Sequence, residues 1–170
     1  MLARGVHAAR VQTVPLTVIE SVPDALWLPR GGRADVVLDL GGPAPTPTGL
    51  VRLLVLSGRN IFCVPRDNSS NLDLPTRAVP QLDDGRATAL RLALDILGGP
   101  AEITLVGYVR NVVEQAGANY PWPTPSAHFT VWAANGEPQV AGTWLALDDA
   151  DSPLRNRHWW ALMPHETERG

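Results

Sequence analysis

The residues of this chain that are best spaced for chemistry lie in one helical segment, and few of them are acidic. Asp84 to Leu97 has an amphipathic helical pattern, in which positions 92, 95 and 96 are separated by three and four residues and therefore share one face. Carboxylates at all three positions would form a patch suited to hard divalent cations that bridge to a diphosphate. The sequence places Leu92, Asp95 and Ile96 there. Asp95 alone would bind magnesium weakly.

Two further acids could complete a metal site with Asp95. Asp83 lies at the start of the helix, where a short acid is also explained as an N-cap that accepts hydrogen bonds from free backbone N–H groups. Glu114 ends a long apolar segment beside a flexible loop, where an acid can equally be solvated. The other acids that could contribute are Asp73, Asp148, Asp149 and Asp151.

Arginine, histidine and aromatic residues suggest a site for an anionic ligand with a flat ring. All 14 basic residues are arginine, which fits either a GC-rich gene or a set of bidentate phosphate clamps. Arg91 can pair with Asp95 one helical turn later. Tyr120 and Trp122 in a Pro-rich loop, with His128 on the next strand, could surround a base, because bases stack on aromatic rings. The alternatives are ordinary packing residues and a hydrogen-bonded structural histidine.

Composition limits the classes of protein that fit. A chain of 170 residues with 45% hydrophobic and 18% charged residues is sized for one globular domain. The net charge of −3 argues against a nucleic-acid or membrane-surface binder. The single cysteine, Cys63, excludes an intramolecular disulfide and lies in an apolar run typical of a core. Without a signal-peptide pattern or a membrane-length apolar stretch, the expected location is the cytoplasm.

Alternating apolar residues predict strands on both sides of the helix. The first, at 11–18, has Pro15 and is expected at a sheet edge, and 21–28 is expected to form a helical turn. A Pro/Gly loop at 41–49 precedes two strands joined as a hairpin by Ser57-Gly58-Arg59. The further predicted strands and the terminal helix are 34–40, 50–56, 60–65, 101–114, 127–134, 143–147 and 153–163. This order favours a mixed α/β or α+β sandwich.

The stretch from Leu72 to Gly98 resembles the signature box of the Nudix hydrolases. That box runs Gly, five residues, Glu, seven residues, Arg-Glu, an aliphatic, any residue, Glu-Glu, any residue, Gly and an aliphatic, after an aromatic–acid–Leu–Pro entry. The entry falls on Leu72-Asp73-Leu74-Pro75, and Arg91 and Gly98 are identical to the box. The remaining positions become Arg77 for the glycine, Asp83 for the first glutamate, Leu92 for the second, and Asp95-Ile96 for the glutamate pair.

The resemblance covers residues 34–165 and implies a Nudix-type α/β/α sandwich with a mixed β-sheet and one well-defined Nudix helix. Residues 1–33 are then an N-terminal extension with a strand, and 166–170 a tail. The resemblance implies hydrolysis of nucleoside-diphosphate-linked compounds. Magnesium would be held by Asp83, Asp95 and Glu114, and Arg91 would orient the carboxylates.

The altered box leaves several hypotheses. The chain is either a divergent hydrolase with weak or absent magnesium binding, or an inactive domain that binds a small phosphorylated, nucleotide-like ligand or a protein partner. A third hypothesis is a homodimer built by the segment before residue 34. Arg77 replaces a glycine that would allow close backbone approach to a phosphate, so it either blocks that approach or faces the phosphate oxygens as a fixed cation. We favour ligand binding on a hydrolase fold, with no nucleic-acid or membrane partner.

Overall fold

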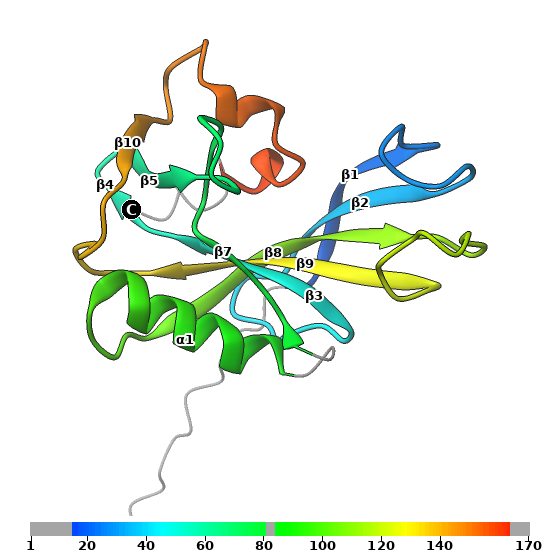
Figure 1. Cartoon of the computed structure of the whole chain (residues 1–170), viewed down its shortest axis with the longest axis horizontal. Helices are drawn as coiled ribbons and strands as arrows, with labels where there is room; N and C mark the ends of the chain where they lie inside the picture. Colours follow the sequence, from blue (N-terminus) through cyan, green and yellow to red (C-terminus); the bar gives the residue numbers. More distant parts are fainter. Residues whose placement is uncertain (1–14, 81–83, 164–170) are drawn as a thin grey trace, which may run out of the picture.

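The computed structural model of the chain describes residues 15–80 and 84–163 and has three layers (Figure 1). Helix α1 (Gly85–Leu97) covers one face of a six-stranded sheet. The opposite face is covered by a smaller sheet and by two short 3-10 helices, η2 (Pro153–Asn156) and η3 (Trp160–Leu162). None of the described helices is long and apolar enough to cross a membrane.

The large sheet is mixed, because β3 and β9 run parallel while every other pair of adjacent strands in it is antiparallel. Its strands, in spatial order, are β1 (Thr17–Pro23), β2 (Arg33–Leu38), β8 (Ile103–Val112), β9 (Ser126–Ala134), β3 (Thr48–Leu54) and β7 (Thr76–Ala78). The smaller sheet contains β10 (Thr143–Ala146), β5 (Asn60–Pro65) and β4 (Leu56–Ser57), with β6 (Leu72–Asp73) paired to β5. Strands alternate their side chains between two faces, so each layer boundary has its own apolar core.

The helix begins and ends where the sequence predicts. Asp84 is the N-cap, and its carboxylate accepts a hydrogen bond from the backbone N–H of Arg86 at 3.0 Å. Gly98 ends the helix at φ 73°, a left-handed conformation that glycine adopts without steric cost. The predicted strands at 34–40, 101–114, 127–134 and 143–147 are also confirmed, within two residues at each end.

Three local predictions are wrong. Residues 21–28 do not form a helical turn, because Ser21 to Pro23 continue β1 along β2 and the Ser21 hydroxyl donates to Asp35 at 2.7 Å. The hairpin is formed by β4 and β5 alone, since β3 pairs with β9 and the chain crosses between sheets near Val55. The terminal helix is two 3-10 turns, because Arg157 has extended backbone (φ −76°, ψ 142°). The first predicted strand, 11–18, overlaps β1 only at residues 17 and 18, because β1 runs from Thr17 to Pro23; residues 11–14 lie outside the described residues, and β1 is at the sheet edge.

Two titratable groups of the core, Cys63 and His128, have pKa values shifted mainly by burial. Cys63 is fully buried, and burial raises the pKa of its thiol to about 12, so it is the core residue predicted from its apolar neighbours. His128 is buried on the α1 side of β9, where its Nδ1 lies 2.8 Å from the Pro47 carbonyl oxygen and its ring meets Tyr108 edge to face. Burial lowers the pKa of His128 from 6.5, and Arg110 lowers it further, against the effect of the Pro47 carbonyl.

Acidification is therefore expected to destabilise the fold through His128. The unfolded chain binds the proton at its ordinary pKa of 6.5 while the folded chain binds it only at lower pH, so the free energy of unfolding falls as pH drops below 6.5. Denaturant unfolding over about pH 5 to 8 should show a smaller decline in His128→Asn, whose amide can still donate to Pro47. The pKa of His158 is also lowered, chiefly by burial. The two proteins compared, with His128 and with His128→Asn, should therefore both carry His158→Gln, so that His158 does not contribute to the pH dependence. If the free energy of unfolding has the same pH dependence in both proteins, His128 does not cause the decline.

Candidate functional site

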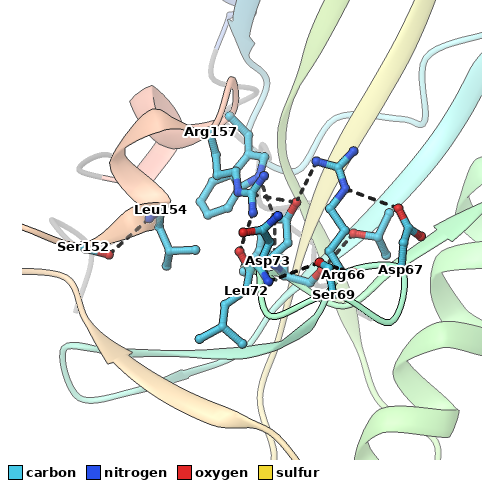
Figure 2. Close-up of polar contacts among 12 residues, drawn as sticks. Arg66, Asp67, Ser69, Leu72, Asp73, Ser152, Leu154 and Arg157 are labelled. Carbon is cyan, nitrogen blue, oxygen red and sulfur yellow. Dashed lines mark hydrogen bonds and ion pairs between the residues drawn. The ribbon is translucent and has the colours of Figure 1, made fainter.

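A buried carboxylate, Asp73, lies at the centre of a cluster of arginines (Figure 2). Its Oδ1 accepts hydrogen bonds from the backbone N–H of Leu74 at 2.8 Å and from the indole N–H of Trp159 at 3.1 Å. Its Oδ2 lies 3.8 Å from Arg157 Nε and 4.0 Å from Arg66 Nη1. Both oxygens are thus engaged, and the carboxylate joins β6 to the C-terminal segment.

Arg52 adds a third guanidinium to this cluster from the middle of β3. Its Nε is buried and has no hydrogen-bond partner within the described residues. Burial lowers the pKa of Arg52, and Arg66 and Arg157 lower it further, while Asp73 opposes them. Removing cations from water is costly unless opposite charge compensates them. Three guanidinium groups around one carboxylate therefore leave a positive site that an anion would stabilise.

Two of these arginines, Arg52 and Arg66, open onto a cleft on the sheet face that points away from α1. One compartment, of about 290 Å³, is lined by Arg52, Arg66 and Arg77 together with residues of β5, β6 and β7. A second compartment, of about 160 Å³, adjoins the first, because both are lined by Leu50, Arg52 and Arg66. Its other lining residues are Val109, Asn111, Trp122, Phe129 and His158.

Trp122 forms the aromatic wall of the second compartment, as the sequence predicts for a ligand-binding position. Its ring packs edge to face on Phe129 at a centroid distance of 5.0 Å. It also lies directly over Gly49, where a Cβ atom would come within 2.9 Å of the indole. Glycine at 49 is therefore needed for this close approach, which places the loop 115–125 beside β3 and β9.

The helix that should carry a metal site instead uses its residues for packing and for an ion pair. Leu92 and Ile96 are buried in the core between α1 and the sheet, while Asp95 is exposed. Arg77 Nη2 donates to Asp95 Oδ2 at 2.7 Å. The predicted Arg91–Asp95 pair is wrong, because Arg91 donates to the hydroxyl of Thr88 at 3.2 Å, back toward the start of the helix. A guanidinium thus occupies the only carboxylate of the three-position face.

Glu114, another predicted metal ligand, does not join Asp95. Glu114 is exposed and follows the end of β8 where Val112 pairs with Ser126. Asp95 lies near the opposite end of this strand pair, because the adjacent helix end contacts Gln139 beyond β9. Asp83 lies outside the described residues. Among residues 15–80 and 84–163, no group of three His, Cys, Asp or Glu could hold a metal ion. Within the described residues, Asp95 and Glu114 therefore do not form a common set of oxygen ligands.

Two predicted ligand-binding residues lie away from the cleft. His128 is on the α1 face of β9, opposite the face on which Phe129 contacts Trp122. Tyr120 does not line the described compartments, and its buried hydroxyl has no described partner. Of the four predicted residues, Trp122 and Arg77 line the cleft, but the guanidinium of Arg77 is turned to Asp95 on α1.

Sequence reasoning missed two cleft residues that carry an available signal. Arg52 is the only charged side chain of β3, and Asn111 alternates with the buried Val109 and Val113 at the end of β8. A polar residue inside a buried strand requires a partner or destabilises the fold. Isolated polar positions in apolar strands are therefore the signal that points to this cleft.

The arrangement of layers is the Nudix-type α/β sandwich that the sequence predicts, since it matches a solved hydrolase along most of both chains. That structure is a variant of the Bacillus subtilis pyrophosphohydrolase BsRppH, with a TM-score of 0.57 and 10% identity over 89% of this chain and 98% of the other. An ADP compounds hydrolase matches with a TM-score of 0.49 and 11% identity over 92% and 96% of the two chains. No protein-family model and no curated protein matches the sequence. The likeness to BsRppH establishes the fold.

Asp73 is expected to be the residue on which the arginine cluster depends. Asp73→Asn keeps the shape but leaves Arg52, Arg66 and Arg157 without a counter-charge, and should lower the free energy of unfolding by about 3 kcal/mol. The matched control is Asp67→Asn, an exposed acid 3.7 Å from Arg66, which should change stability by less than about 0.5 kcal/mol. Urea unfolding measures the free energy of unfolding of both variants. Sulfate, an anion that can compensate the arginines, should reduce the difference between the two variants. Equal effects of the two variants would contradict the assigned role.

Proposed function

We propose that this protein binds a small phosphorylated, nucleotide-like ligand on a Nudix-type fold, with weak or no magnesium-dependent hydrolysis. The observation that supports this most is the excess of cations around Asp73, of which Arg52 has a buried Nε without a described partner. Phosphate oxygens accept charge-assisted hydrogen bonds from guanidinium groups, often in pairs. Arg52 and Arg66 line both compartments and are the groups we assign to the phosphate.

Trp122 supports a nucleotide-like ligand over inorganic phosphate alone. It lines the compartment next to the arginines, so a ligand with phosphate on Arg52 can extend a flat ring toward the indole. Stacking of a base on an aromatic side chain contributes about 1–3 kcal/mol. A phosphate and an attached ring would therefore both be bound within one cleft.

The chemistry at the helix supports binding over rapid hydrolysis. Asp95, the acid retained on the three-position face, is neutralised by Arg77, and Asp73 in the cleft has both oxygens occupied. A hydrolase would need a group that activates water close to the phosphate. Apart from Asp73, the described cleft residues include one acid, Asp67, which is exposed and lies beside Arg66.

Calorimetric titration with ADP and with pyrophosphate tests the proposal. Both are expected to bind in the presence of EDTA, because the arginines supply the positive charge. Arg52→Gln should weaken both about 10- to 100-fold through the loss of charge-assisted hydrogen bonds. The control is Arg59→Gln, which removes an exposed guanidinium paired with Asp148 at 2.7 Å, outside the cleft. Its affinities should equal those of the unmodified chain.

Two results would overturn this proposal. Absence of binding by both compounds would remove the phosphate site. Binding only with magnesium, together with release of phosphate or AMP from the substrate, would identify an active hydrolase. Thermal unfolding of each variant separates loss of binding from loss of folding.

Asp95→Ala distinguishes a guanidinium site from a metal site. The Arg77 side chain lies on the α1 face of the sheet, away from the cleft, so loss of the exposed ion pair should change the affinity for pyrophosphate in EDTA by less than about twofold. Glu102→Ala, which removes an exposed acid just before β8, is the control and should leave affinity unchanged. If Asp95 holds a catalytic metal, the variant will instead lose magnesium-dependent affinity and turnover.

A further inference from the structure

Asn111 is a buried polar residue that no structural role in the described chain explains. It lies at the end of β8 with 8% of its surface exposed, and its Oδ1 is buried without a hydrogen-bond partner. Its cross-strand neighbours are Ala34 on β2 and Ala127 on β9, so neither adjacent strand offers a polar side chain. A buried acceptor without a donor destabilises a fold, and a ligand donor would remove that cost.

The carboxamide faces the second compartment of the cleft. Asn111 lines it together with Trp122 and Phe129, and Arg52 and Arg66 lie at the boundary with the first compartment. The strand order β8, β9, β3 places Asn111, Phe129 and Arg52 in sequence across the sheet. The compartment therefore has cations at one side, an unpaired acceptor at the other and aromatic rings between them.

We infer that Asn111 is the specificity-determining residue of this cleft and selects a heteroaromatic ring that carries an exocyclic amino group. The inference rests on the proposed function, because the phosphate on Arg52 and Arg66 holds the ring against Trp122. Asn111 Oδ1 then accepts a hydrogen bond from the ring's N–H. A 6-aminopurine offers this donor, whereas a 6-oxopurine presents an acceptor at the same position.

The unpaired Oδ1 of Asn111 also determines the preference for an amino ring over an oxo ring. An oxo ring would instead accept from Asn111 Nδ2, which leaves Oδ1 without the donor that it lacks and therefore disfavours the oxo ring. The amino ring satisfies Oδ1 and leaves the stacking surface of Trp122 unchanged. Selection therefore depends on one hydrogen bond, while most of the affinity comes from the phosphate and the stacked ring.

Calorimetric titration with four compounds tests this inference on the whole chain. They are ribose 5-phosphate, AMP, inosine monophosphate and purine riboside 5′-monophosphate, which lacks the amino group. AMP should bind at least about tenfold more tightly than ribose 5-phosphate, because only AMP carries a ring that stacks. AMP should also bind about 3- to 10-fold more tightly than purine riboside 5′-monophosphate, the effect of one buried hydrogen bond. Inosine monophosphate should bind more weakly than AMP.

Asn111→Val assigns the preference to this residue. The variant should equalise AMP and purine riboside 5′-monophosphate while leaving the affinity for ribose 5-phosphate unchanged. Its thermal stability should be equal or higher, because an unpaired acceptor is replaced by a strand-forming apolar side chain. Arg52→Gln is the opposite control: it should weaken all four compounds without changing their order.

The outcomes separate this inference from the proposed function. Binding of ribose 5-phosphate with no gain for AMP, or equal or tighter binding of inosine monophosphate, overturns the role of Asn111 and leaves the phosphate site standing. A preference for AMP that survives Asn111→Val also overturns it. Absence of binding by all four compounds, and by pyrophosphate, overturns both proposals. The comparison among ligands on the unmodified chain tests the role of Asn111 even if a variant fails to fold.

Discussion

The burial of Asp73 among arginines is the constraint on which the cleft depends. Its carboxylate is fixed by the Leu74 backbone and the Trp159 indole, and it lies between Arg66 and Arg157. Because these groups come from β6, the loop that follows β5 and the C-terminal segment, one carboxylate joins distant parts of the chain. The single negative charge compensates the cations only in part, and the same interaction that closes the fold therefore leaves a site for an anion.

The second ion pair, Arg77 with Asp95, follows from how α1 packs. Leu92 and Ile96 are buried, and burying an aliphatic side chain of this size contributes about 1.5–3 kcal/mol. Carboxylates at these positions would have required metal ions or solvent in place of that packing. Because Leu92 and Ile96 are buried in the core, Asp95 remains on the helix surface, where it pairs with Arg77. The helix therefore packs against the sheet, and the charged residues of the cleft belong to other elements of the chain.

Local signals in the sequence predict the elements well. Asp84 and Gly98 bound the helix because caps depend on nearby backbone groups, and the alternation in β8 and β9 depends only on which residues are apolar. The pairing of β3 with β9 could not be predicted in this way, since Leu50 and Phe129 are far apart in the chain. The same limit applies to the cleft: residue type alone indicates Arg77 and Trp122, whereas the cluster around Asp73 needs three-dimensional contacts.

A fold shared with a pyrophosphohydrolase at 10% identity fixes the path of the backbone and leaves the chemistry to the side chains. Here the cleft retains the shape of a small-ligand site, but its positive charge is covalently part of the chain, on Arg52 and Arg66. A bound metal ion can lower the pKa of water and generate a nucleophile, whereas a guanidinium group supplies positive charge and hydrogen bonds but no nucleophile. Under the proposed function, a cleft that supplies cations but no group to activate water would bind a phosphate rather than cleave it. Fixed arginines and a buried Asn111 acceptor are both features of recognition, and they lie in the same cleft.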